Sequence, residues 1–149
     1  MDFAVGHRGD LGQRCVRILV DRPAGTVLVS FADSPRLAEP SYLTVQLDAD
    51  THIRPSPAFL ECVNHSCTPN VAFDMEQLAL VAVRDLGAGD ELVYFYPSTE
   101  WQMAQAFTCA CGAAGCLGVI DGASHLSEAL LAPYTLSPFI RAQLAIRAP

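Results

Sequence analysis

Three groups of residues in this sequence have types and spacings suited to chemistry. The first is the string NHSCTPN at Asn64–Asn70, and the second is ELVYFY at Glu91–Tyr96. The third is a cysteine cluster among alanine and glycine, made of Cys109, Cys111 and Cys116. Tight turns let such closely spaced thiolates converge on one tetrahedral ion. The cluster therefore predicts a metal site with one ligand position still to be filled.

The cysteine content also has to be weighed against a disulfide framework. Six cysteines in a short chain fit such a framework in secreted domains. The opening MDFAVGHRGD has no apolar signal-peptide region, so metal ligation is the favoured interpretation. Cys15 and Cys62 lie apart from the cluster in apolar surroundings. We expect both to be small buried hydrophobic side chains.

Taken in order, these motifs resemble those of the SET-domain protein-lysine methyltransferases with a cysteine-rich post-SET tail. The resemblance covers roughly residues 14–118 and is most specific over residues 64–116. It implies transfer of a methyl group from S-adenosylmethionine to a lysine side chain of a protein substrate. It also implies one zinc ion with four cysteine ligands, namely Cys67, Cys109, Cys111 and Cys116.

The resemblance assigns roles to tyrosines. Tyr96, the last residue of the ELVYFY string, matches the catalytic tyrosine whose hydroxyl orients the amine. Tyr94, two residues earlier on the same strand face, matches the position that sets how many methyl groups are added. Tyr42 matches a second tyrosine of the lysine channel. On the residues alone, each of the three is equally compatible with an aromatic ring that packs in the core or at a strand end.

Cofactor contacts are implied in a similar way. Asn64 and His65 match residues that contact S-adenosylmethionine, and Phe107 and Leu117 match apolar side chains around adenine and the lysine channel. A turn or core pair and local packing near the cysteines are the alternatives. The glycine-containing GxG loop of the family falls on Gln13–Cys15, with Arg14 in its middle, so the second glycine is absent. Arg14 is retained as a cofactor-binding candidate.

Methyl transfer to an amine requires a neutral nitrogen behind the methyl carbon. Free lysine titrates near ~10.4, and an aromatic channel beside a positive sulfur disfavours the ammonium form. Two departures from the family pattern remain. Phe95 stands where Asp is common, and Glu61-Cys62 replaces Arg-Phe. The alternative function is therefore a SET-like, zinc-containing peptide-binding module without turnover. A zinc-ribbon interaction domain would account for too little of the chain.

Composition limits the partners. At 149 residues and 51% hydrophobic content, the chain is expected to form one globular core. The net charge of −7 repels nucleic acid and favours a basic protein segment as partner. The apolar runs are too short for a membrane span, so we expect a cytoplasmic protein. All nine basic residues are arginine, so the chain has no lysine of its own to methylate. The oligomeric state is left open.

The fold class expected from patterning is mainly β. Strands are predicted over 16–20, 26–31, 42–47, 78–83 and 91–96, the first two as a pair, with one helical turn at 55–62. A short helix is predicted from Glu100 after a Thr99-x-x-Gln102 capping box, and helices over 125–131 and 138–146. Residues 1–14 are expected to be a loosely ordered lead-in.

The family fold adds several small sheets with a knot-like strand crossing. Residues 1–104 would form the SET domain, 105–120 the zinc-binding post-SET segment, and 121–149 a helical tail.

Overall fold

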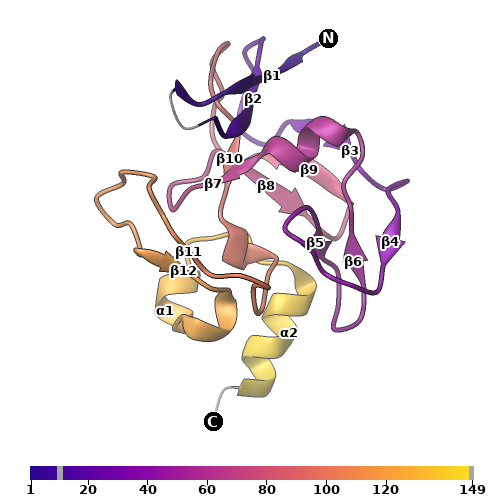
Figure 1. Ribbon diagram of the computed structural model, residues 1–149, viewed down its shortest axis with the longest axis vertical. Coiled ribbons are helices and arrows are strands. Elements are labelled where there is room, and N and C mark those ends of the chain that lie inside the picture. Colours follow the sequence, from indigo (N-terminus) through magenta and orange to yellow (C-terminus); the bar gives the residue numbers. More distant parts are fainter. Residues whose placement is uncertain (10–11, 148–149) are drawn as a thin grey trace.

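The computed structural model describes residues 1–9 and 12–147 and is mainly β (Figure 1). Its strands are β1 (Phe3–His7), β2 (Arg14–Ile18), β3 (Val27–Ser30), β4 (Arg36–Leu37), β5 (Val45–Gln46), β6 (His52–Ile53), β7 (Asn64–His65), β8 (Val71–Asp74), β9 (Ala79–Ala82), β10 (Val93–Tyr94), β11 (Phe107–Thr108) and β12 (Val119–Ile120). The helices are the 3-10 turns η2 (Ala58–Cys62), η3 (Tyr96–Ser98) and η4 (Ala123–His125), followed by α1 (Glu128–Leu131) and α2 (Pro138–Arg147). Among the described residues, no helix is long and apolar enough to cross a membrane.

The strands form several small sheets, as expected. β3, β9 and β8 make one three-stranded sheet, and β4, β6 and β5 make another. The remaining sheets are the pairs β1–β2, β7–β10 and β11–β12. Strands this short bury little surface individually, so each sheet depends on packing against its neighbours.

The amino-terminal segment corrects two expectations. Residues 3–7 are not a loose lead-in but form β1, which pairs with β2 along its whole length. Residues 10 and 11 of the predicted lead-in lie outside the described residues. The strands predicted over 16–20 and 26–31 do not pair with each other, because β3 pairs with β9. Phe3 stacks on Phe59 of η2 at 4.8 Å between ring centroids, which provides the packing that the isolated sequence pattern did not show.

The expected strand crossing centres on β7 and β10, which are far apart in sequence yet pair in parallel. The loop after β7 continues along β10, since the backbone N–H of Ser66 donates to Tyr94 O at 3.0 Å and that of Asn70 to Val93 O at 3.1 Å. The Asn70 side chain also bonds the backbone of Glu91 and Val93. The NHSC loop is therefore fixed across β10, two residues before Tyr96.

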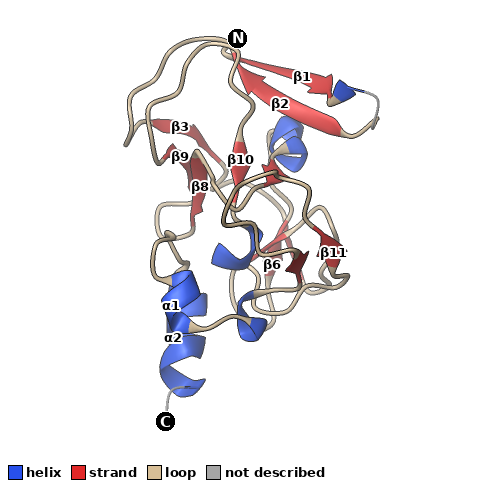
Figure 2. Ribbon diagram, turned by 90° about the vertical axis from the view of Figure 1, so that its left-hand side faces the viewer, coloured by secondary structure: helices blue, strands red, loops and turns tan. Residues whose placement is uncertain are grey.

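The carboxyl-terminal region holds the two α-helices, α1 and α2 (Figure 2). α2 begins as predicted, with Ser137 Oγ accepting a hydrogen bond from Ile140 N at 3.1 Å. The predicted helix over 125–131 forms only at its end, as α1. The helix predicted from Glu100 does not form. The Thr99 hydroxyl donates to the Glu100 carboxylate at 2.6 Å, and among the described residues it accepts no hydrogen bond from a backbone N–H, so it caps no helix.

Two of the predicted strands are shorter than expected. Only Val45–Gln46 of the 42–47 segment pairs in a sheet. Only Val93–Tyr94 of the 91–96 segment does so, because Tyr96 already opens η3 and Pro97 follows. Shortening at Tyr96 matters for the site, since it turns the chain away from the sheet at the candidate catalytic residue.

Candidate active site

Tyr94 and Tyr96 lie where β10 ends and η3 begins, beside the strand β7. Their rings are 4.6 Å apart between centroids, so the two side chains share one face as the alternation predicted. The Tyr96 hydroxyl donates to Val63 O at 3.3 Å. Burial raises the pKa of Tyr96 to about 12, so its hydroxyl keeps its proton at neutral pH.

His65 connects Tyr96 to the cysteine cluster. Its Nδ1 accepts a hydrogen bond from the backbone N–H of Tyr96 at 3.1 Å, and its Nε2 lies 3.5 Å from Cys67 Sγ. Burial lowers the pKa of His65 to about 4, so the ring is neutral. Since Nδ1 accepts, the ring proton is assigned to Nε2, facing the sulfur. His65 therefore positions Tyr96 from one side and the NHSC loop from the other.

Asn64 fixes the segment that stands in place of the glycine loop. Its amide donates to Arg14 O at 2.7 Å and accepts from Gln13 Nε2 at 2.9 Å. Cys15 is fully buried, so the side chain at the missing glycine packs into the interior. The Arg14 side chain is exposed. The residue that replaces the second glycine, Cys15, thus faces the interior, and Gln13 and Arg14 form the exposed side of this segment.

Phe107 and Leu117 bring the carboxyl-terminal region to the same place. The Phe107 ring lies 5.6 Å from the His65 ring and 5.8 Å from the Tyr96 ring. The backbone N–H of Leu117 donates to Cys67 Sγ at 3.5 Å. Both side chains are half-buried, and the Phe107 ring presents apolar surface beside His65.

The four predicted zinc ligands come together. The sulfur atoms of Cys67, Cys109, Cys111 and Cys116 all lie within 4.8 Å of one another. Cys67 and Cys109 are 4.0 Å apart, close to the ~3.8 Å that a tetrahedral site with bonds of ~2.3 Å requires. Burial raises the pKa of the Cys109 thiol to about 12 in the absence of a cation. The donor set and its spacing fit a structural zinc ion.

A pocket of about 660 Å³ opens on the side of the two tyrosines. Tyr94 and Tyr96 line it together with apolar side chains such as Val63 and Phe73. Tyr42 lines the same pocket but is 91% exposed, since the residues around it form a turn and not the predicted strand. Tyr42 therefore lies at the rim of the pocket that Tyr94 and Tyr96 line.

Sequence reasoning missed three charged residues here. Arg8 and Glu91 form an ion pair of 2.8 Å next to Asn64. Glu100 lines the tyrosine pocket, and burial raises its pKa to about 7, partly offset by hydrogen bonds from Thr99 and Gln46. The sequence feature that could have pointed to Glu100 is its position directly after Thr99. The Thr99-x-x-Gln102 pattern there was interpreted as the start of a helix.

The profile of the SET domain matches residues 13–97 of this chain. The chain belongs to the SET-domain family. The SET-domain match covers the candidate catalytic tyrosines and the Asn64–His65 pair, and it ends before the cysteine cluster.

Relatives of this SET domain include methyltransferases. The chain is 38% identical over 131 residues to a protein of Aspergillus flavus named Methyltransferase flvH, with 87% of this chain and 73% of that protein covered. It is 35% identical over 66 residues to an H3 lysine-4 specific histone-lysine N-methyltransferase of Aspergillus fumigatus. That match covers 40% of this chain and only 5% of the fungal enzyme.

Solved structures support the SET-domain fold. The chain superposes on KRYPTONITE in complex with DNA, an H3(1–15) peptide and SAH with a TM-score of 0.59 and 23% identity. A second KRYPTONITE complex, with DNA and SAH, gives a TM-score of 0.61 and 21% identity. Each match covers 78% of this chain, against 29% and 28% of the KRYPTONITE chains.

Proposed function

We propose that this SET domain transfers a methyl group from S-adenosylmethionine to the amine of a lysine side chain in a protein or peptide. The observation that carries the proposal is the position of Tyr96. Its side chain lines the 660 Å³ pocket, and its backbone N–H donates a hydrogen bond to the His65 ring. A substrate amine in the pocket would thus meet the Tyr96 hydroxyl at the side where His65 and Phe107 gather.

The cofactor would be held on the opposite side of Tyr96 from the pocket. Asn64, His65, Phe107 and Leu117 supply an amide, backbone groups and an apolar surface there. Bound S-adenosylmethionine supplies an activated methyl group. The presence of SAH in the KRYPTONITE complexes supports this choice of cofactor.

The substrate would be basic. The net charge of −7 favours encounter with a positively charged segment. One KRYPTONITE complex contains an H3(1–15) peptide, and several relatives are named histone-lysine methyltransferases, so that peptide is a reasonable first acceptor. Tyr42 would contact the substrate at the pocket rim. Zinc in the four-cysteine site would hold the Phe107 and Leu117 segments against His65.

Calorimetry and labelling together test the proposal against a binding module without turnover. The zinc-loaded protein is titrated with S-adenosylmethionine, and then incubated with labelled cofactor and either the H3(1–15) peptide or a fungal lysate. Label on lysine supports the proposal. Because the chain has no lysine, that label cannot come from methylation of its own side chains. Cofactor binding without any labelled lysine would support the binding module.

A further inference from the structure

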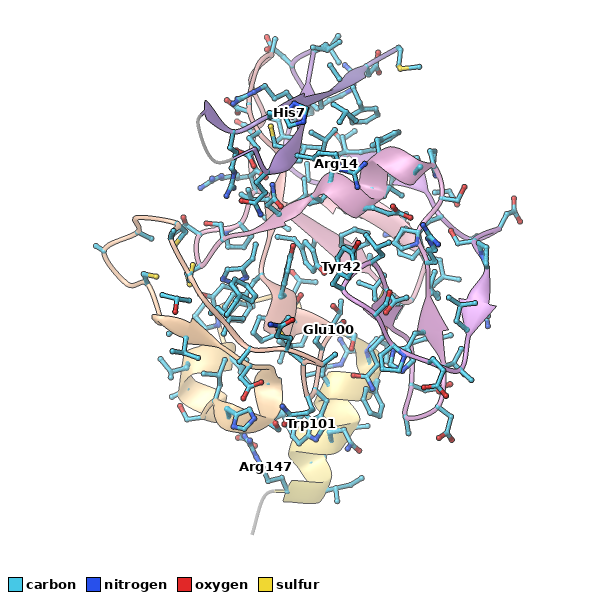
Figure 3. All side chains as sticks on the ribbon, in the orientation of Figure 1. His7, Arg14, Tyr42, Glu100, Trp101 and Arg147 are labelled. Atoms are coloured by element: carbon cyan, nitrogen blue, oxygen red, sulfur yellow. The ribbon has the colours of Figure 1, made fainter. Side chains whose placement is uncertain are left out.

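Glu100 is a carboxylate built into the wall of the tyrosine pocket. It lies just after η3, and Figure 3 shows it near the middle of the molecule. Its backbone is held in place, since the N–H of Ala123 donates to Glu100 O at 2.8 Å. A Cβ on Gly122 would come within 2.5 Å of Trp101 O, so only glycine allows this close approach. Glu100 is therefore presented from a rigid segment.

The two oxygens of Glu100 differ. Oε2 accepts hydrogen bonds from Thr99 Oγ1 at 2.6 Å and from the backbone N–H of Gln46 at 3.0 Å. Among the described residues, no donor bonds to Oε1. In the described part of the chain, His52 Nδ1 is the one fully buried side-chain polar atom without a partner, so Oε1 of the partly exposed Glu100 retains accessible surface. That surface faces the pocket, which Glu100 lines.

Within residues 1–9 and 12–147, no basic side chain balances this carboxylate. The lining of the pocket over these residues contains no arginine, and the sequence contains no lysine. The other titratable groups that line the pocket are Tyr42, Asp50, His52, Glu61, Tyr94 and Tyr96. Burial lowers the pKa of His52, so this histidine is not a cation at neutral pH. Glu61 is paired with Arg54 at 2.8 Å, whereas Glu100 forms no ion pair in the described part of the chain.

A buried carboxylate without a positive partner is costly unless a cation joins it. The free oxygen, the lack of a local cation and the two adjacent tyrosines identify the missing partner as a positively charged amine. We infer that Glu100 binds the ammonium group of the substrate and accepts its proton before methyl transfer. This inference rests on the proposed function and adds a residue that recognises and prepares the amine.

The proton and electron balance is simple. The substrate R–NH3⁺ gives one proton to the Glu100 carboxylate, leaving R–NH2 and a neutral carboxylic acid. The nitrogen lone pair then forms a bond to the methyl carbon as the carbon–sulfur bond of S-adenosylmethionine breaks, with that electron pair left on sulfur. The products are R–NH2⁺–CH3 and S-adenosylhomocysteine. The pKa of Glu100, about 7, is well suited to a general base at neutral pH.

A structural role alone would make a different prediction. Glu100 joins the Gln46 backbone to its own segment, and the Gln46 side chain returns a bond to Trp101 N at 3.0 Å. In Glu100→Gln, the amide oxygen can still accept both existing hydrogen bonds. The contact with the Gln46 backbone is therefore kept, and only the negative charge is lost. Glu61→Gln is the matched control, because it removes a second carboxylate of the same pocket that is already paired.

The test does not require a known substrate. Binding of n-butylammonium to the zinc-loaded protein with S-adenosylhomocysteine is followed by NMR from pH 5 to pH 8, with n-butanol as the neutral probe. We expect the affinity of the wild-type protein for butylammonium to rise about tenfold with pH as Glu100 ionises. Glu100→Gln should abolish this rise, Glu61→Gln should keep it, and butanol should show none.

Equal butylammonium binding in the wild type and in Glu100→Gln would overturn the inference, as would pH-independent binding in the wild type. The latter readout holds even if the variant misfolds. For any acceptor that becomes labelled, kcat/KM at pH 7 should fall about 100-fold in Glu100→Gln and continue to rise above pH 8. Full activity in Glu100→Gln would refute only the role of Glu100 and leave the proposed function standing. If the wild-type protein labels no lysine in the lysate, that result counts against the proposed function itself.

Discussion

The molecule contains two hydrophobic cores built in different ways. The first is made by strands, with side chains such as Val16, Ile18 and Leu80 fully or almost fully buried. The second contains Cys67, Phe95 and residues of the carboxyl-terminal helices. It has few paired strands, and its edge consists of four thiols within 4.8 Å. Backbone pairing supports the first core, whereas the second would depend on a zinc cross-link through these thiols.

The candidate active site lies at the seam between these cores. Tyr96 packs against both cores. The two residues before it are in different cores, Tyr94 in the first and Phe95 in the second. Phe95 stands where the family commonly has Asp, and its ring stacks on Tyr134 at 3.6 Å between centroids. The residue that departs from the family pattern, Phe95, thus contributes an aromatic contact to the second core. The comparison teaches that catalysis would require both cores to be correctly docked.

Breaking the cross-link should have the largest effect. In Cys67→Ser, the tail segment should lose its zinc and its order, because a structural zinc site contributes folding free energy directly. Since Phe107 and Leu117 belong to that segment, cofactor binding should be lost as well. Metal analysis, expected to give about one zinc per chain in the wild type, and proteolysis of the 105–120 segment measure the effect.

Cys62→Ala is the matched control, because Cys62 is buried in the first core away from the cluster. It should keep its zinc and destabilise the whole domain by about 1–2 kcal/mol through lost packing. An unchanged zinc affinity in Cys67→Ser would contradict the proposed cross-link and the division into a strand-supported and a metal-supported core.

Removing the hydroxyl at the seam should have the next largest effect. Tyr96→Phe keeps the ring contacts with His65 and Phe107 but loses the bond to Val63 O. We expect turnover to fall about 100-fold, because a misplaced amine reacts slowly, while cofactor affinity changes about threefold or less. Single-turnover kinetics and calorimetry separate these quantities. Equal losses of both would indicate a structural tyrosine.

The same division explains what could be predicted from sequence. The motifs that identify the family are short and specific, so the four cysteines that come together in the structure were predicted as one group from the sequence. Strand existence was often correct, as for β9 and β10. Strand partners were not, because periodicity shows which face is apolar but not which strand will cover it. β1 was missed for a different reason, since residues 1–14 are rich in glycine and charge and show no apolar periodicity.

Glu100 was missed because two local patterns competed. Thr99-x-x-Gln102 is a valid capping signal, yet the Thr99 hydroxyl bonds Glu100, while Gln102 bonds Asp121 at 3.1 Å. Tertiary contacts with residues 121–123 thus override a local helix preference. The strand predicted over 42–47 is mostly absent for a related reason, since the alternation is real but only β5 finds a partner.

The pH dependence of stability provides a third test, specific to the seam. Burial raises the pKa of Glu100 to about 7, whereas an unfolded glutamate titrates near ~4.3. Between these values the folded protein binds more protons than the unfolded chain, so stability falls as pH rises through this range and levels off above pH 7. From pH 5 to pH 8 this group should cost roughly 2 kcal/mol.

Denaturant unfolding of the substrate-free, zinc-loaded protein measures that cost. Glu100→Gln should remove this part of the pH dependence, whereas Glu61→Gln should preserve it, because Glu61 is paired with Arg54. The contrary outcome is a stability that rises from pH 5 to pH 8 in the wild-type protein and rises by the same amount in Glu100→Gln and Glu61→Gln. That outcome would show that Glu100 carries no buried charge.

The smallest expected effect on rate concerns Tyr94, on the first-core side of the seam. Its ring lies 4.6 Å from both Phe73 and Tyr96, and the residue is 7% exposed. Burial raises the pKa of Tyr94 well above its usual range, so the hydroxyl stays protonated. It can hold the amine, or a water beside it, in the space that a further methyl group would need.

We therefore expect mainly monomethylated product from the wild-type protein. Tyr94→Phe should shift the product toward di- and trimethyl-lysine, with the first methyl transfer slowed about threefold or less, because the ring and its packing remain. Mass spectrometry of the methylated acceptor measures the distribution, and Phe73→Leu serves as a control that alters packing on the same ring without removing a hydroxyl. Trimethyl-lysine from the wild type would exclude this role for Tyr94, and the same shift in Phe73→Leu would assign it to packing in the first core.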